Sequence, residues 1–229
     1  ETAPTGRLTA AHHHGLLGLR PSPLDTLTGA LTSIIIPNLN GFPHLTRCVE
    51  SMRAHTRGPV ELVVVDNGST DGSLEWLAAQ PDVRLIALGE NRGAPAARNV
   101  GLAAARGETI VFCDNDVVFT PQWRPLLLAH LTRWPDVGLV GPMSDYVAGA
   151  QKIDPMPTPA AVLDDYARAV TASRSGQHIY TSRLILFFVM GRRAVFDQIG
   201  GICESYGRWG FEDDDLSIRA AAAGWRLRI

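Results

Sequence analysis

The sequence is poor in lysine and has no excess of positive charge. Lys152 is the only lysine, and 21 lysine and arginine residues stand against 23 acidic ones, so the net charge is −2. Without excess positive charge, the chain lacks the electrostatic footprint of a nucleic-acid-binding protein. Arginine in place of lysine, together with many alanines, is typical of a GC-rich bacterial genome.

Long apolar runs and a cysteine framework are missing as well. Cys48, Cys113 and Cys203 lie far apart and form no CxxC pair, so we expect reduced, buried thiols in a reducing compartment. Apolar runs such as residues 184–190 are far shorter than the roughly 20 residues of a membrane span. No secretory signal follows Glu1. We therefore expect a cytoplasmic protein without a transmembrane segment, and peripheral association with the inner face of the membrane stays open.

Residues 1–31 differ in composition and hydrophobic pattern from the rest of the chain. They contain proline, threonine, glycine and three adjacent histidines, His12 to His14, without a sustained hydrophobic period. This composition is typical of a flexible or surface-lying arm, and a metal site at the histidines is the weaker alternative. We interpret residues 32–229 as one domain. Because the chain begins at Glu1 and not at Met, we expect it to be a piece of a longer protein.

From residue 32, short apolar runs alternate with helical patterns. The expected strands are 33–36, 60–65, 83–88, 109–113, 137–140, 183–190 and 225–229, and the expected helices are 43–55, 73–79, 94–106, 121–133, 193–199 and 210–223. Residues 144–180 are less regular, and we expect a loop or lid there. This alternation predicts an α/β fold with a mostly parallel, doubly wound sheet flanked by helices.

Polar residues gather where three expected strands end, at 37–40, 66–69 and 114–116. Ligands of open α/β sheets bind at the carboxyl ends of the strands, so we expect the chemistry at this edge. Asp114 and Asp116 flank Asn115 directly after a buried run, and two carboxylates at this spacing can hold one hard cation and the phosphates that it carries. Taken alone, the same pattern also fits a solvated turn.

A second acidic group, Glu212 to Asp215, opens the last expected helix. Helix capping and a pair between Asp215 and Arg219 account for part of this group. Tyr206, Trp209 and Phe211 precede it, and a carboxylate held beside aromatic groups in a partly dehydrated pocket is a fair general base for a hydroxyl. We therefore single out this helix start as a candidate catalytic site.

A third pattern is weaker and surrounds Arg98. Asn91, Arg92 and Gly93 form a loop before an alanine-rich helix whose first turns carry Arg98. Such a helix usually indicates close packing only. An arginine that faces the strand ends is nevertheless able to meet a phosphate or a base.

Five stretches in this order resemble the inverting family 2 glycosyltransferases, which have the GT-A fold. They are SIIIPNLNG (33–41), VELVVVDNGSTDGS (60–73), ENRGAPAARNVGLAAARGETIVFCDND (90–116), VGLVGPMSDYVAGAQKI (137–153) and GFEDDDLSIRAAAAG (210–224). The resemblance covers about residues 32–229. The pattern is most similar to a bacterial subgroup that is often fused to other domains.

The resemblance implies an activity and its partners. It predicts transfer of a sugar from a UDP-, GDP- or dTDP-sugar to a carbohydrate or other acceptor hydroxyl, with inversion and with Mg²⁺ or Mn²⁺. The residues implied in donor binding are Pro37, Asn40, Asp66, Asn67, Arg98, Asp114 and Asn115, with Asp114 and Asp116 as metal ligands in a DXD motif. Asp213 matches the second acid of the ED motif and is implied as the catalytic base, with Glu212 before it. Trp209 and Tyr206 are candidates to stack on the acceptor.

The chain departs from the family pattern at two places. Many members have two acids where this chain has Asp66 and Asn67, which leaves the nucleotide base open. Many members also place a metal-binding histidine a few residues beyond the last strand, and this chain stops at Ile229 before that position. We therefore expect the domain to be truncated at its C-terminal end.

Two other functions remain as alternatives. The stretch CDNDVVF resembles the nucleophile motif of haloacid-dehalogenase phosphatases, but that class needs a later lysine, and Lys152 lies in an irregular region. The second alternative is a non-catalytic module that binds sugar nucleotides. The complete acidic motifs argue against it.

Overall fold

The computed structural model describes residues 29–154, 162–174, 176–208 and 210–229, so residues 1–28 of the expected arm, with its three histidines, and Trp209 lie outside the described residues. The described residues form one eight-stranded sheet in the order β3-β2-β1-β4-β7-β5-β8-β6. Its strands are β1 (Thr32–Asn38), β2 (Val60–Asp66), β3 (Val83–Ala87), β4 (Thr109–Cys113), β5 (Val137–Val140), β6 (Tyr180–Thr181), β7 (Phe188–Arg192) and β8 (Arg226–Arg228).

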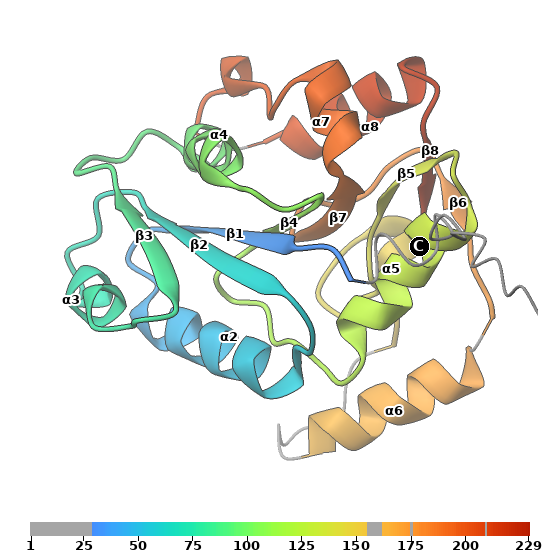
Figure 1. Cartoon of the computed structure of the whole chain (residues 1–229), viewed down its shortest axis with the longest axis horizontal. Coiled ribbons are helices and arrows are strands. Elements are labelled where there is room, and N and C mark those ends of the chain that lie inside the picture. The colour runs from blue at the N-terminus through green and yellow to red at the C-terminus, as the bar shows by residue number, and fades with distance from the viewer. Residues whose placement is uncertain (1–28, 155–161, 175, 209) are drawn as a thin grey trace, which may run out of the picture.

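Helices cover both faces of this sheet (Figure 1). On one face lie α2 (Phe42–His55), α3 (Ser73–Ala78) and α5 (Trp123–Arg133), and on the other lie α4 (Ala94–Ala104), α7 (Arg193–Ile199) and α8 (Glu212–Ala222). The described residues also form the 3₁₀ turns η1 (Gly149–Gln151) and η3 (Glu204–Tyr206) and the helix α6 (Leu163–Ser173). The predicted α/β fold with a flanked sheet is confirmed.

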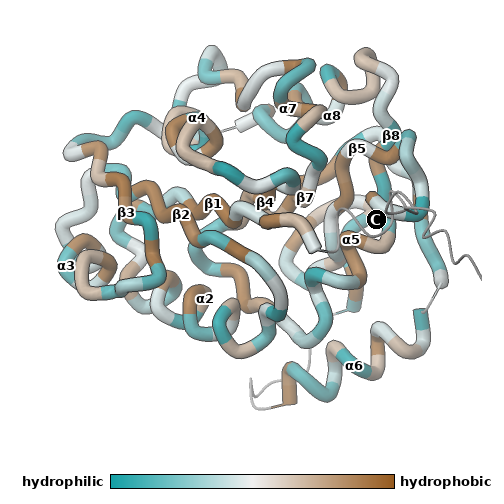
Figure 2. The backbone as a smooth tube through the Cα atoms, viewed as in Figure 1, coloured by the Kyte–Doolittle hydropathy of each residue, from teal (hydrophilic) through white to brown (hydrophobic). Residues whose placement is uncertain are grey.

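The strands that lie in the middle of the sheet are apolar on both faces. Every residue of β4 is buried, and so are the three consecutive isoleucines of β1, Ile34 to Ile36. Figure 2 shows these strands as the most hydrophobic part of the tube, with hydrophilic residues on the outer sides of the helices. A strand covered on both faces needs a continuous apolar run, which is why the sequence pattern identified β1, β2 and β4.

The sheet is mostly parallel, as predicted, since four of its seven strand pairings are parallel, including that of β5 with β8. Strands β1, β2, β3 and β4 pair in parallel, but β7 is antiparallel to both β4 and β5, and β6 is antiparallel to β8. β7 begins at Phe188, which pairs with Cys113 at the carboxyl end of β4. The long connection after β5 has therefore returned the chain to the carboxyl edge of the sheet before β7 starts.

Two expectations for residues 144–190 are wrong. A helix, α6, lies in the expected loop, although Leu163, Tyr166, Ala167 and Val170 recur in its sequence at helical spacing. The strand expected at 183–190 begins only at residue 188. Before it, the backbone N–H groups of Leu184 and Ile185 donate to side chains, Ser217 Oγ and Gln151 Oε1, and not to a neighbouring strand.

The cysteines are free, and Cys48 and Cys113 are buried as expected, but Cys203 is partly exposed. Among the described residues, no helix is both long and apolar enough to cross a bilayer.

Gly101 sets how closely α4 approaches the sheet. A Cβ atom added there would lie 2.3 Å from Ile35 Cγ2 in β1. We expect Gly101→Ala to lower the free energy of unfolding by about 1–3 kcal/mol, because overpacking outweighs the gain in helix propensity. Urea unfolding checks this value. Replacement of Ala103 by valine on the exposed side of the same helix is the control and should stay within about 0.7 kcal/mol of the wild type. Equal stability of the Gly101 variant and the wild type would show that the contact is not tight.

His130 on α5 makes stability depend on pH. Burial, with Arg228 and His178 nearby, lowers the pKa of His130 to about 4 in the folded protein. The unfolded chain binds more protons between pH 4 and about 6.5, so stability falls as the pH drops through that window. We expect the melting temperature of His130→Phe to fall less than that of the wild type between pH 7 and pH 4.5. Parallel pH profiles for the two proteins would contradict this assignment.

Candidate functional site

The loops that follow β1, β2 and β4 are joined by one chain of side-chain hydrogen bonds. Asn115 Nδ2 donates to Asn38 Oδ1 at 2.7 Å, and Asn38 Nδ2 donates in turn to Asp66 Oδ2 at 3.2 Å. Asp66 is buried, and its other oxygen accepts from the backbone N–H groups of Gly68 and Ser69. Asp66 therefore shapes the turn after β2 and ties it to β1 and β4.

Asn67 and Asn40 extend this network to neighbouring loops. The buried Asn67 accepts from the backbone N–H of Arg92 at 2.9 Å and donates to Asn91 Oδ1 at 3.2 Å, which links β2 to the loop before α4. Asn40 adopts a positive φ of 50°, and its side chain accepts from the N–H of Thr70 at 2.8 Å. The structure thus brings together the residues expected around the nucleotide base.

Pro37 lies at the same edge, near the end of β1. The last residue of β1 that pairs with β4 is Ile35, so Pro37 lies where the two strands have separated. Its lack of an N–H group therefore costs no hydrogen bond to β4. Pro37 is partly exposed, unlike the three isoleucines before it.

Arg98 connects the two acidic motifs. Its side chain is 5% exposed; Nη2 donates to Asp114 Oδ1 at 2.5 Å, and Nη1 lies 3.5 Å from Glu212 Oε1. Because one arginine reaches an acid after β4 and an acid at the start of α8, these two motifs face the same cleft. Nε and Nη1 are buried without a hydrogen-bond partner among the described residues, so Arg98 has donors to spare.

The pKa of the Asp114 carboxyl group is raised, although the charges around it have opposing effects. Burial raises the pKa of its carboxyl group, the guanidinium of Arg98 opposes that rise, and the negative charges of Asp116 and Glu212 add to it. A carboxylate in this position gains from a nearby cation, because like charges otherwise disfavour its ionised form.

A cleft of about 310 Å³ lies between the two motifs. Its walls include Arg98, Asp114, Glu212, Asp213, Arg183 and Phe211. Asp213 lies in the first turn of α8, with 14% of its side chain exposed. The structure therefore brings the acids after β4 and the acids of the last helix to the same cleft.

Arg183 is the immediate partner of Asp213. Its Nη2 lies 3.0 Å from Asp213 Oδ2, and its Nε lies 3.0 Å from Asp214 Oδ1. The hydrogen bond to Asp213 raises the pKa of Arg183. The expected pair of Asp215 and Arg219 is also present, with Arg219 Nε donating to Asp215 Oδ2 at 2.7 Å.

Of the aromatic residues expected beside the acids, Phe211 lines the cleft, and Phe187 lines it as well. Tyr206 is 47% exposed and Phe211 is 71% exposed, with their ring centroids 6.4 Å apart. Phe211 adopts a φ of 63°, a conformation rare for a bulky residue, directly before the acidic run. Such backbone strain is concentrated at functional sites in proteins. The two rings form an exposed surface near the acids.

Asp114 and Asp116 fit a cation that arrives with a phosphorylated ligand. Asp114 is 36% exposed at its side chain, and Asp116 is exposed. In the described part of the chain, no three histidine, cysteine or acidic side chains gather into a metal site. Mg²⁺ commonly binds through one or two carboxylates and takes its remaining ligands from phosphates and water. Two carboxylates are therefore a sufficient protein contribution.

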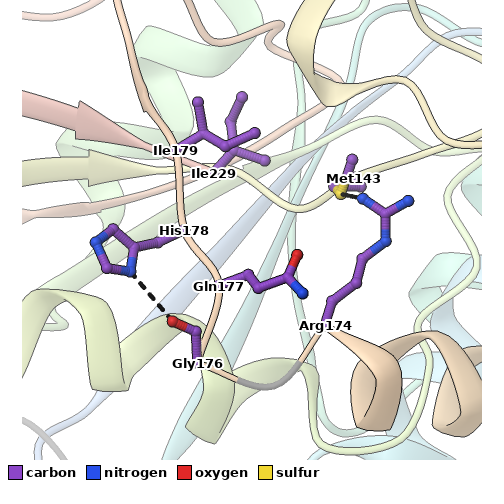
Figure 3. Close-up of a pocket in the computed structure, with 7 residues that line it drawn as sticks. All are labelled: Met143, Arg174, Gly176, Gln177, His178, Ile179 and Ile229. Carbon is purple, nitrogen blue, oxygen red and sulfur yellow. Dashed lines mark hydrogen bonds between the residues drawn. The ribbon is translucent and has the colours of Figure 1, made fainter.

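A larger cavity, of about 420 Å³, lies between the end of α6 and strands β6 and β8 (Figure 3). There Arg174 donates to the sulfur of Met143 at 3.5 Å, and the His178 ring lies 3.4 Å from the Gly176 carbonyl oxygen. None of the residues that line it is acidic, and none was singled out from the sequence. The smaller, acid-lined cleft is therefore the stronger candidate.

Sequence reasoning missed Asn38 and Arg183. Asn38 stands between Pro37 and Asn40 in a polar strand end, but its role depends on β1 lying between β2 and β4. Arg183 directly precedes the apolar run 184–190, and this position indicates only the start of a strand. Its contact with Asp213 spans 30 residues along the chain, and no local pattern signals it.

Two family models match the chain. Residues 33–200 match the model described as glycosyl transferase family 2, and residues 178–229 match the one described as the N-terminal domain of galactosyltransferase. The chain is also 30% identical over 209 residues to an N-acetylglucosaminyl-diphospho-decaprenol L-rhamnosyltransferase of Mycobacterium tuberculosis. That alignment covers 80% of this chain and 68% of the relative.

Two solved structures share the fold. The mannosyltransferase PcManGT from Pyrobaculum calidifontis, in complex with GDP-Man and Mn²⁺, has a TM-score of 0.61 and 23% identity over 92% of this chain and 56% of its own. GalNAc-T7 with UDP, GalNAc and Mn²⁺ has a TM-score of 0.68 and 16% identity over 87% of this chain and 42% of its own. The chain thus spans about half the length of these two proteins.

Proposed function

Because the chain belongs to glycosyl transferase family 2, we propose that it transfers a sugar from a nucleoside diphosphate sugar to an acceptor hydroxyl. The family consists of sugar-transferring enzymes, and the chain has their GT-A fold. We include dependence on a divalent metal ion and inversion at the anomeric carbon in this proposal. The observation that carries it is the shared cleft, in which Arg98 joins Asp114 to Glu212.

We assign the nucleotide of the donor to the loops after β1, β2 and β4. Pro37, Asn40, Asp66, Asn67 and Asn115 lie in or beside these loops. The side chains of Asp66 and Asn67 are already engaged by protein groups, so their main effect is to hold the loops in shape for the base and ribose. A preorganised loop binds a ligand with less loss of entropy.

Arg98 is suited to the diphosphate. It is held by Asp114 and Glu212, and its Nε and Nη1 groups, which have no hydrogen-bond partner among the described residues, would serve as donors to phosphate oxygens. Asp114 and the exposed Asp116 would together hold a divalent cation. Bound Mg²⁺ or Mn²⁺ would act as a Lewis acid and neutralise the charge that develops on the leaving diphosphate.

Asp213 is our candidate for the catalytic base, with Glu212 before it. Its carboxylate lies in the wall of the cleft that also contains Asp114, so it is placed to accept the proton of an acceptor hydroxyl. Proton transfer of this kind contributes about 10²–10⁴-fold to a rate. Attack from the face opposite to the diphosphate inverts the anomeric carbon. The exposed rings of Phe211 and Tyr206 offer a face on which an acceptor sugar can stack.

The structure gives no support to the phosphatase alternative, because the lysine that it requires is not at the cleft. Lys152, the only lysine of the chain, is exposed after η1 and does not line the cleft. A phosphatase of that class needs a lysine beside its aspartates, so the arrangement favours sugar transfer.

A donor screen tests the proposal. The chain is heated with UDP-N-acetylglucosamine, GDP-mannose or dTDP-rhamnose, with Mn²⁺ or with EDTA, and release of the nucleoside diphosphate is followed in parallel. We expect one donor to raise the melting temperature only with Mn²⁺, since a ligand at 100 times its Kd adds about 2.7 kcal/mol of stability. We also expect slow release of its nucleoside diphosphate, with water in place of the acceptor. Stabilisation without release would favour the non-catalytic module, and activity on a phosphate monoester would favour the phosphatase.

A further inference from the structure

Arg183 bridges two acids at the mouth of the cleft from the connection between β6 and β7. Its guanidinium contacts both acids: Nη2 lies 3.0 Å from Asp213 Oδ2, and Nε lies 3.0 Å from Asp214 Oδ1. Arg183 is 50% exposed, whereas Asp213 is 14% exposed. The arginine thus covers a nearly buried carboxylate from the solvent side.

The carboxylate of Asp213 is restrained at both oxygens. Oδ2 accepts from Arg183, and Oδ1 accepts from the backbone N–H of Asp214 at 3.0 Å. An aspartate in the first turn of a helix can otherwise rotate its carboxylate freely. A planar guanidinium with two anchored arms limits that rotation, because its donors have a fixed geometry.

The backbone around Arg183 is itself fixed. The N–H of Arg183 donates to Thr181 Oγ1, and Thr181 Oγ1 donates to the Arg183 carbonyl oxygen at 2.9 Å. The next residue, Leu184, donates its N–H to Ser217 Oγ on α8 at 3.1 Å, one turn beyond Asp213. Arg183 and Asp213 are therefore joined twice, through their side chains and through the backbone.

An ordinary surface ion pair has little effect on a protein. Arg53 and Asp82 form such a pair, also through two arms of the arginine, between α2 and the start of β3 and away from the cleft. Arg183 differs from Arg53 because its partner is the nearly buried acid that faces Asp114 across the cleft. This comparison supplies a matched control.

We propose that Arg183 is a positioning residue that holds the Asp213 carboxylate at the angle needed to take the proton of the attacking hydroxyl. The proposal rests on the sugar transfer proposed above. Asp214 anchors the second arm of the guanidinium and keeps it from swinging away from Asp213. A lysine lacks the rigid, planar fork of donors that fixes both acids in one geometry.

The test compares Arg183→Ala, Arg183→Lys and Arg53→Ala in Mn²⁺-dependent release of nucleoside diphosphate from the donor that binds in the screen. A misplacement of about 1 Å can cost about 10²-fold in rate. We therefore expect kcat of Arg183→Ala to fall about 10²-fold, with the KM for the donor and the Mn²⁺-dependent thermal shift retained. Arg183→Lys should recover part of the loss, as should guanidinium ion added to Arg183→Ala. Arg53→Ala should keep the kcat of the wild type.

Three results would overturn the assignment of Arg183. They are a wild-type kcat in Arg183→Ala, a loss of donor binding equal to the loss of kcat, and a loss of kcat that neither lysine nor guanidinium restores in any part. Failure of the wild type to release nucleoside diphosphate from any donor has a different meaning, because it removes the proposed transferase function itself.

Discussion

Asp213→Asn is expected to abolish transfer while donor binding survives. The substitution keeps the size of the side chain and a partner for Arg183, but the neutral amide cannot accept a proton. Loss of a general base costs about 10²–10⁴-fold in rate, so kcat should fall by that factor. The Mn²⁺-dependent rise in melting temperature should remain, because the metal and the nucleotide are assigned to groups after β1, β2 and β4. Release of nucleoside diphosphate and thermal shift, measured on the same sample, check both parts.

Asp165→Asn is the matched control for this variant. Asp165 also lies in the first turn of a helix and pairs with an arginine, Arg168, at 2.9 Å, but it lies on α6 and is exposed. The control should keep the kcat of the wild type. Near-wild-type activity of Asp213→Asn would show that another group takes the proton.

Asp116→Ala is expected to remove metal-dependent binding of the donor. Asp116 is exposed at the end of β4 and is assigned, with Asp114, to the cation on the diphosphate. With one of only two carboxylate ligands removed, the donor and Mn²⁺ should no longer raise the melting temperature together. The variant with Mn²⁺ should then behave as the wild type does with EDTA, and both should lose release of the nucleoside diphosphate.

Asp82→Ala is the control for the metal site. It removes an equally exposed aspartate from a surface ion pair with Arg53, and it should retain the full Mn²⁺-dependent shift. An unchanged shift in Asp116→Ala would place the cation elsewhere.

The strands that are buried on both faces could be predicted from the sequence. β1, β2 and β4 are buried on both faces, so each is a continuous apolar run. The acids after β4 and at the start of α8 lie at positions where a carboxylate needs a partner or a ligand. The rule that carboxyl ends of parallel strands share an edge places the acids after β4 at the ligand edge, whereas the start of α8 reaches them through α7 and η3.

The elements that depend on distant contacts were not predicted. The direction of β7 depends on where the connection after β5 ends, and no local pattern records that. α6 does carry a helical period, but the prolines and glycines at 149–159 before it favoured a loop. Arg183 gains its importance only because the turn before β7 places it against α8. The roles of the individual site residues remain predictions that the variants above test.

The central claim is that the metal-bound donor and the base share the cleft crossed by Arg98. The most direct measurement is an anomalous-scattering map from crystals of this chain soaked with Mn²⁺ and UDP or GDP. The account predicts a manganese peak between Asp114 and Asp116, with the diphosphate beside Arg98 and the carboxylate of Asp213 facing it across the cleft. A peak bound away from these two aspartates, or a diphosphate on the far side of the sheet from Asp213, would contradict it.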